Sequence, residues 1–89
     1  MNRFRWNHWN IEHLAEHRVA PGDAEHVVNL ARRPYPRQIE DEKFYIAGQS
    51  PDGTYLQVIY VLDADDVIYV IHARPLTDRE KRIYRRSKR

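Results

Sequence analysis

Two apolar segments on either side of a short acidic one constrain the fold of this chain more than any other feature. The segments cover residues 54–62 and 67–74, and residues 63–66 between them include three aspartates. Both segments are rich in the β-branched and aromatic residues that favour strands, and both are far too short to span a bilayer. The sequence therefore predicts two antiparallel strands joined by an acidic turn.

The alternation of side chains assigns the two faces of this strand pair. If Leu62 lies opposite Val67, one face is apolar throughout and should pack against helices. Its residues are Leu56, Val58, Tyr60, Tyr69, Ile71 and Ala73. The other face carries Val61, Ile59, Ile68 and Val70 near the turn, and Gln57, Tyr55, His72 and Arg74 at the far end. Polar, aromatic and titratable side chains are thus predicted to gather at that far end.

Helical spacing marks the N-terminal third of the chain. Asn7 is a suitable cap for a helix over residues 8–17, because its side chain can accept a hydrogen bond from a free backbone N–H. A second helix is predicted to begin at Pro21 and to stop at Pro34. Its apolar residues follow i, i+3, i+4, i+7 spacing: Ala24, Val27, Val28 and Ala31. Two tryptophans flank the first helix and are interpreted as structural: Trp6 and Trp9.

The residues around the strand pair predict two more strands and a last helix. A Pro-interrupted edge strand covers residues 35–39, and a second strand covers residues 43–49 after an acidic turn. The sequence Pro51-Asp52-Gly53 is a strong hairpin turn, because Gly accepts a positive φ. Thr77 and Glu80 form a capping box for a helix from residue 78 to about residue 86.

With a short extended segment at residues 4–6, the predicted order is β-α-α-β-β-β-β-α. The fold class is α+β, with two N-terminal helices packed on an antiparallel sheet of about four strands. A chain of 89 residues has room for one core, so residues 1–89 form a single domain, with 84–89 as a basic, frayed tail. The absence of cysteine excludes disulfides and thiolate metal sites. No segment resembles a signal peptide, and we expect a soluble, cytoplasmic protein that does not bind membranes.

The last eighteen residues, 72–89, concentrate positive charge. Eight of them are Lys or Arg and two are acidic, which gives +6; the whole chain carries +2, so residues 1–71 sum to −4. The basic residues are Arg74, Arg79, Lys81, Arg82, Arg85, Arg86, Lys88 and Arg89. Such a patch is typical of a protein that binds nucleic acid or phosphate. The alternative is a solvated tail that only keeps the protein soluble.

This patch and the strand before it contain the residue types that RNA cleavage needs. Internal attack by a 2′-OH requires a base, an acid and a cation near the phosphate. The predicted catalytic residues are His72, Arg74, Arg79, Arg82 and Tyr84, with Tyr55 as an alternative to Tyr84. The predicted RNA-binding residues are Lys81, Arg85, Arg86, Tyr55 and Gln57. Two structural alternatives stay open: a bond from His72 to a carbonyl, and a salt bridge from Arg74 to Glu80.

A further motif, His13-Leu14-Ala15-Glu16-His17, matches the H-x-x-E-H pattern of inverted zinc peptidases. Two histidines one turn apart on a helix can bind zinc, but the catalytic site needs a third protein ligand. Peptidases of that kind are also far larger than this chain. The motif therefore favours an ordinary surface helix, and we expect no metal and no cofactor.

Several short motifs occur in a characteristic order along the chain. In the N-terminal half they are Trp6, Asn10-Ile11-Glu12-His13, His17-x-Val19, Pro21 and Glu25. In the C-terminal half they are Asp41-Glu42, Tyr45-Ile46-Ala47-Gly48, Gly53, Leu56-x-Val58, Val70-Ile71-His72-Ala73-Arg74 and Arg79-Glu80. In this order and spacing, residues 4 to about 84 resemble the BrnT-like toxins of bacterial type II toxin–antitoxin systems. Two positions depart from that pattern: Arg18 stands where relatives usually have Gly, and His72 where a small hydroxyl residue is usual.

The resemblance implies a RelE-like fold, a ribonuclease activity that arrests translation, and neutralisation by a cognate antitoxin with a ribbon-helix-helix domain. It also implies that the toxin–antitoxin complex binds DNA and represses its own operon. Arg18 at the exit of the first helix requires a turn that is strained or built differently. We expect the antitoxin to cover Gln57, His72, Arg74 and the last helix in a salt-sensitive complex. The alternative function is a non-catalytic RNA- or protein-binding module of the same fold.

Overall fold

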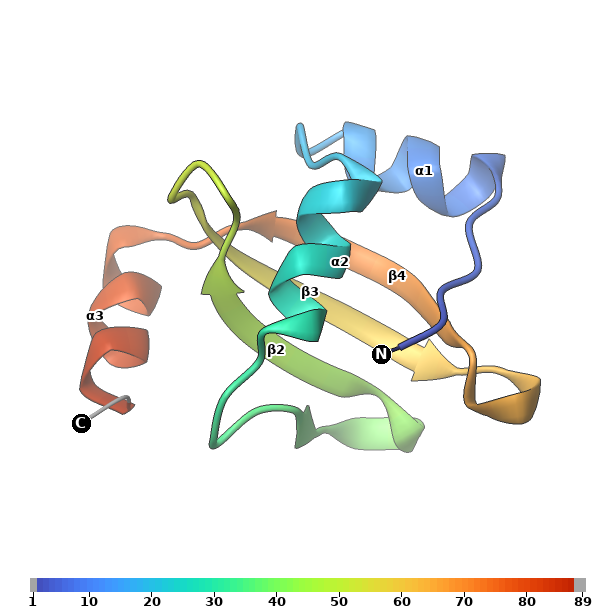
Figure 1. Ribbon diagram of the computed structural model, residues 1–89. Coiled ribbons are helices and arrows are strands. Elements are labelled where there is room, and N and C mark those ends of the chain that lie inside the picture. Colours follow the sequence, from blue (N-terminus) through green and yellow to red (C-terminus); the bar gives the residue numbers. More distant parts are fainter. Residues whose placement is uncertain (1, 88–89) are drawn as a thin grey trace.

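The computed structural model describes residues 2–87, which form three helices and a four-stranded antiparallel sheet (Figure 1). The helices are α1 (His8–Ala15), α2 (Pro21–Asn29) and α3 (Asp78–Ser87). The strands are β1 (Arg37–Gln38), β2 (Phe44–Gln49), β3 (Tyr55–Leu62) and β4 (Ile68–Pro75), side by side in that order. The α+β class and the antiparallel sheet are confirmed.

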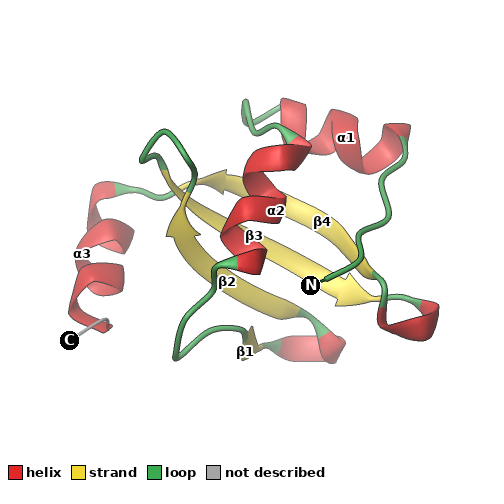
Figure 2. Ribbon diagram, viewed as in Figure 1, coloured by secondary structure: helices red, strands yellow, loops and turns green. Residues whose placement is uncertain are grey.

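Helices α1 and α2 pack on the sheet and bury the main core against it. Figure 2 shows α2 crossing in front of the strands and α1 lying along β4. The buried core residues are Leu14, Val19, Ala24, Val27, Val28, Ile46, Leu56, Val58, Tyr60, Ile68, Val70 and Ala73. The predicted packing of the N-terminal helices against Leu56, Val58 and Tyr60 is confirmed.

A β-bulge in β4 shifts the pairing of the last two strands. Tyr60 pairs with Val70 and Ile59 pairs with His72, so Ile71 is the extra residue. The observed register differs from the predicted one by one residue near the turn and by two residues beyond the bulge. A slip of one residue exchanges the two faces of a strand, whereas a slip of two residues preserves them.

The predicted faces of β4 are accordingly wrong near the turn and right beyond the bulge. Ile68 and Val70 are buried in the core, whereas Tyr69 and Ile71, which were expected there, are only half-buried. Beyond the bulge, Ala73 is buried and Arg74 lies on the opposite face, as predicted. His72 pairs with Ile59, but its ring contacts His13 and His17 at α1.

Asn10 is fully buried and connects three segments of the chain. Its side-chain Nδ2 donates to the carbonyl oxygens of Arg5 (3.2 Å) and Val70 (3.1 Å). Its Oδ1 accepts from the N–H of Asn7 (2.9 Å), and the Asn7 side chain accepts from the N–H of Asn10 (3.1 Å). The predicted cap is therefore confirmed as a reciprocal capping box. The N-terminal segment lies beside β4, where Phe4 makes a single parallel bridge instead of the predicted strand.

Helix α2 and the segment after it are shorter than predicted. The helix ends at Asn29 rather than near Pro34, because the N–H of Ala31 bonds to the carbonyl of Val28 (3.3 Å) and tightens the last turn. The edge strand expected at residues 35–39 retains only β1. Proline has no N–H to donate to a ladder, which limits pairing on either side of it.

The last helix begins at the predicted capping box, in which Thr77 and Glu80 bond reciprocally. It continues to Ser87, and Tyr84 is buried within it, whereas a frayed tail was expected from Tyr84 onward. Lys88 and Arg89 belong to that expected tail and lie outside the described residues. Within residues 2–87, no helix is long and apolar enough to cross a membrane.

Arg18 follows α1 in a left-handed conformation, with a φ of 62°. Its N–H bonds to the carbonyl of Ala15 (2.9 Å), and the N–H of Val19 bonds to the carbonyl of Leu14 (3.1 Å). With Leu14 and Val19 both in the main core, these bonds form a Schellman motif. Because Gly is the favoured residue at the left-handed position, the strained turn expected at this helix exit is confirmed.

We expect Arg18→Gly to raise the free energy of unfolding by about 0.5–1 kcal/mol, because Gly adopts left-handed angles without a Cβ clash. Urea denaturation of the two proteins measures the difference. Glu16→Gly is the matched control, since Glu16 has a φ of −58°. There Gly should lower the free energy of unfolding by about 0.5–1 kcal/mol. Equal losses in both variants would show that Arg18 is not strained.

Candidate nucleic-acid interface

The sheet face opposite α1 and α2 carries polar and aromatic residues. They alternate with the core residues along three strands: Tyr45, Tyr55, Gln57 and Arg74. Helix α3 covers part of this face and buries Tyr84 in a second, smaller core with Ala47 and Leu76. Three half-buried tyrosines pack around it: Tyr35, Tyr45 and Tyr55. Two residues of the predicted polar end, Tyr55 and Arg74, therefore contact the last helix.

Arg74 forms a two-pronged ion pair with Glu80, which links β4 to the first turn of α3. Its Nη1 and Nη2 donate to the two carboxylate oxygens, both at 2.8 Å. The pKa of Glu80 is lowered to about 2, mainly by the bonds from Arg74. The bond from the N–H of Thr77 (2.8 Å) is a second cause. The bond to Glu80 likewise raises the pKa of Arg74.

This ion pair is the structural alternative that the sequence left open for Arg74. A guanidinium whose fork already holds a carboxylate must exchange that partner before it can bind a phosphate in the same way. Gln57 lies directly opposite Arg74 on β3, and its side chain is buried. The catalytic role of Arg74 and the RNA-binding role of Gln57 stay predictions.

His72 is half-buried beside two histidines that precede and follow the end of α1. Its ring lies 6.1 Å from the ring of His13 and 5.5 Å from that of His17. Burial is the main cause that lowers the pKa of His72, and repulsion from His17, Arg74 and His13 lowers it further. A neutral imidazole at neutral pH can accept a proton, as a general base must. No described residue accepts a hydrogen bond from the ring, so the carbonyl bond considered as an alternative is not found.

The H-x-x-E-H motif does not have the geometry of a zinc site. Helix α1 ends at Ala15, so His17 lies beyond the helix and not one helical turn from His13. No group of three potential ligands within residues 2–87 is arranged to hold a metal ion. Trp9 stacks on His13 with ring centres 5.5 Å apart and is 55% exposed, so it lies outside the core.

Tyr55 lies between two cations of α3. The Arg85 guanidinium is 5.1 Å and the Lys81 ammonium 5.9 Å from the centre of its ring, and Arg85 Nε donates to its hydroxyl at 3.4 Å. Tyr84 packs edge-on against Tyr55 at 5.8 Å and stacks on Tyr35 at 6.1 Å. Three predicted RNA-binding residues and one predicted catalytic residue are thus brought together. Burial makes Tyr84 a packing residue in this structure.

Three arginines on the outer side of α3, the cationic face, are exposed: Arg79, Arg82 and Arg86. Among residues 2–87 none of the three has an ion-pair partner, whereas Lys81 is 3.8 Å from Asp78. Their charge is therefore available to a polyanion. These arginines share α3 with Lys81 and Arg85, which contact Tyr55, and with Glu80, which binds Arg74, whereas His72 lies beside His13 and His17.

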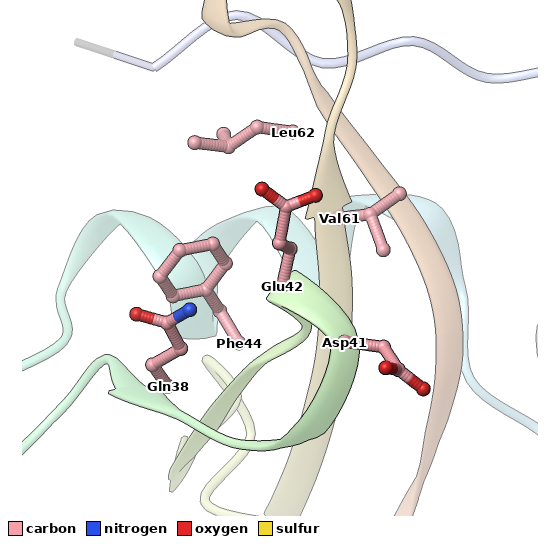
Figure 3. A pocket seen from close by; sticks show the side chains of 6 residues that line it. All are labelled: Gln38, Asp41, Glu42, Phe44, Val61 and Leu62. Atoms are coloured by element: carbon pink, nitrogen blue, oxygen red, sulfur yellow. The ribbon is translucent and has the colours of Figure 1, made fainter.

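Two pockets lie beside β1 and β2, where adjacent residues such as Phe44 and Tyr45 line one pocket each. The acidic pocket has a volume of about 220 Å³ and is lined by Gln38, Asp41, Glu42, Phe44, Val61 and Leu62. Figure 3 shows the Glu42 carboxylate pointing toward Leu62 and the Asp41 carboxylate pointing away from it. The tyrosine pocket has a volume of about 300 Å³ and is lined by Tyr35, Arg37, Ile39, Tyr45, Ala47, Glu80, Ile83 and Tyr84. Carboxylates at the acidic pocket repel nucleic acid, whereas the tyrosine pocket has Arg37 beside Glu80 and suits an anionic polymer better.

Four residues of the tyrosine pocket were not among the predicted site residues: Tyr35, Arg37, Tyr45 and Ile83. The sequence did contain one indication for Tyr45, because strand alternation along β2 places it on the same face as Ala47. The contribution of Tyr35 and Arg37 depends on the path of the chain before β2, which no local pattern reveals.

Comparisons with protein-family models, with curated proteins and with solved structures found no match to this chain. The resemblance to the BrnT-like toxins therefore depends on the sequence motifs alone and stays a prediction, as does the RelE-like fold.

Proposed function

We propose that this chain is the toxin of a type II toxin–antitoxin system and acts as a metal-independent endoribonuclease that inhibits translation. The observation that carries the proposal is the exposed cationic face on the helix that packs against a cluster of four tyrosines, two of them on the sheet. Guanidinium groups attract phosphates and tyrosine rings stack on unpaired bases, a combination typical of single-stranded RNA binding. The motifs shared with the BrnT-like toxins support the same assignment.

In the proposed reaction, neutral His72 removes the proton from a 2′-OH. The 2′ oxygen forms a bond to the adjacent phosphorus while the bond from phosphorus to the 5′ oxygen breaks. Because Tyr84 is buried, Tyr55 would protonate the departing 5′ oxygen, which leaves a cyclic phosphate and a 5′-OH. Arg74, the arginine next to His72 on the sheet, would balance the negative charge that develops around phosphorus once it exchanges Glu80 for the phosphate, and the cationic face would hold the flanking phosphates.

A second candidate function is a non-catalytic RNA- or protein-binding module. The ion pair of Arg74 with Glu80 favours it, because this pair occupies the one arginine that lies next to His72 on the sheet. In that case the cationic face binds RNA or an acidic partner chain without turnover.

The proposed partner, besides RNA, is a ribbon-helix-helix antitoxin that covers the same surface. Acidic or apolar antitoxin segments over Arg74 and α3 would block the path of RNA and relieve the crowding of positive charges. Association should weaken as salt rises. DNA binding by the complex would then come from the antitoxin.

Expression and RNA-binding measurements test this proposal together. Induction of the wild-type chain in bacteria without an antitoxin should arrest growth and translation, and the purified protein should cleave single-stranded RNA. Replacing Arg79 and Arg82 with Ala should lower RNA affinity about tenfold. It should also reduce the slope of log affinity against log salt by about 1.4, since each phosphate contact to a single strand contributes about 0.7.

The matched control replaces Arg3 and Arg5 with Ala, which removes the same charge from the end of the molecule near Asp63 and Asp65. This control should retain nearly wild-type affinity and slope. Normal growth after induction of the wild-type chain would contradict the proposal that it is a toxin. Binding without cleavage would favour the second candidate, and equal losses in both double variants would mean that α3 is not the interface.

A further inference from the structure

The tyrosine pocket has the size and lining of a site for one flat, aromatic group. Tyr35 and Tyr45 form an aromatic wall, with ring centres 6.0 Å apart and planes inclined by 49°. Ile39 and Ile83, with 37% and 52% of their surfaces exposed, contribute apolar atoms. Its volume of about 300 Å³ is at the lower end of the range for small-ligand pockets.

The polar groups of the pocket are few and charged or protonated. Burial is the main cause that raises the pKa of Tyr45, and the neighbouring Tyr35 and Glu80 raise it further, so its hydroxyl remains a donor. The Arg37 guanidinium lies 5.7 Å from the centre of the Tyr35 ring and is exposed. Glu80 Oε2 accepts one hydrogen bond from Arg74. A carboxylate oxygen can accept two, so this oxygen can also accept a hydrogen bond from a ligand.

Positive charge surrounds the opening of the pocket. Ile83 lines it from α3, and Arg79 and Arg86 lie four residues before and three residues after Ile83. Residues at these spacings share one side of a helix. Arg37 adds a third guanidinium at the wall formed by Tyr35. An anionic chain that crosses the opening would therefore meet guanidinium groups on both sides.

We propose that the tyrosine pocket binds one unstacked base of a single-stranded RNA, with the flanking phosphates held by Arg37 and the arginines of α3. The assignment rests on the proposed function, because it takes RNA as the ligand. A base presents an aromatic face to Tyr35 and Tyr45 and hydrogen-bonding edges to Arg37 and Glu80. An apolar protein side chain would leave those polar groups unpaired, so a base is the better occupant.

Binding of the full chain to two labelled ten-nucleotide oligomers tests the pocket. One is a 2′-O-methyl oligoadenylate, which lacks the attacking 2′-OH and is not cleaved, and the other is an abasic backbone of equal length and charge. Tyr45→Leu should weaken binding of the oligoadenylate about fivefold or more, since stacking on an aromatic ring contributes strongly for each base. Binding of the abasic oligomer should not change.

Two further variants keep this test independent of folding. Phe44→Leu removes a ring from the neighbouring position on β2, which lines the acidic pocket, and should leave both affinities unchanged. Ile83→Ala alters an exposed side chain and should weaken oligoadenylate binding about two- to threefold. Thermal unfolding confirms that each variant is folded at the assay temperature.

The outcomes separate the two proposals. If the wild-type chain binds both oligomers equally, phosphate contacts alone explain RNA binding and the pocket is not a base site. If Tyr45→Leu and Ile83→Ala retain wild-type affinity for oligoadenylate, the pocket proposal is overturned and a protein segment becomes its better occupant. If the wild-type chain binds neither oligomer, the RNA partner itself is wrong and both proposals fail.

Discussion

Replacing Asn10 with Asp is expected to lower the free energy of unfolding by about 3–5 kcal/mol, although the two side chains have the same shape. Both bonds from Asn10 Nδ2 go to carbonyl oxygens, those of Arg5 and Val70. A carboxylate at this position cannot donate to either oxygen, and it is a buried charge with no cationic partner in contact. Urea or thermal denaturation at neutral pH measures the loss.

Asn7→Asp is the matched control for this experiment. The Asn7 side chain acts as an acceptor, from the N–H of Asn10 and from the hydroxyl of Tyr69 (3.3 Å). Asp retains both bonds and places a negative charge at the positive end of α1, so stability should change by less than about 0.5 kcal/mol. A similar loss in both variants would mean that Asn10 does not depend on its donors.

Replacing Glu80 with Gln is expected to lower the free energy of unfolding by about 1–2 kcal/mol, because two charge-assisted bonds from Arg74 are lost or weakened. The effect has a pH signature. The bonds from Arg74 keep the pKa of Glu80 near 2, below its ordinary value of 4.5. Its contribution is therefore complete above pH 4.5 and is lost as the pH falls toward 2. Denaturation between these limits should give a flatter stability profile for the variant than for the wild type.

The same substitution tests whether Arg74 can bind RNA once it is released. Glu80→Gln should raise RNA affinity about fivefold, because a freed guanidinium can hold a phosphate with two bonds. Asp78→Asn is the matched control: it removes the same charge from α3 but leaves the pair with Arg74 intact. It should raise affinity less than about twofold, as a screened surface charge does. Equal gains would indicate that only net charge matters and that Arg74 is purely structural.

Local features of this fold could be predicted from the sequence, and features that depend on distant contacts could not. The caps of α1 and α3 and the turn at Gly53 each depend on a few adjacent residues, and all three were predicted correctly. The bulge at Ile71 was missed because one extra residue leaves no mark in an alternating apolar strand. The burial of Asn10 was missed for a related reason, since its partners lie on β4 and on the N-terminal segment.

The candidate site divides in the same way. Arg74 and Glu80 are close together in sequence, so a salt bridge between them could be predicted as an alternative to a catalytic role of Arg74. The structure shows this salt bridge. The tyrosine pocket joins Tyr35, Tyr45 and Ile83, which are far apart in sequence and have no shared motif. Aromatic residues in a small domain fill cores by default, so only the fold reveals which of them line a pocket.

The separation of charge along the molecule has a consequence for how it meets a polyanion. Figure 1 shows α3 at one end and the turn of residues 63–66 at the other, in a molecule with a longest extent of 34 Å. Such a charge arrangement is an electric dipole, and in the field of a nucleic acid it experiences a torque that turns α3 forward before contact. At physiological ionic strength the screening length is about 8 Å. A strand docked on α3 therefore interacts with the charges of α3 and not with the aspartates at the other end of the molecule. A chain with a net charge of only +2 would then behave, at the point of contact, as a strongly basic protein.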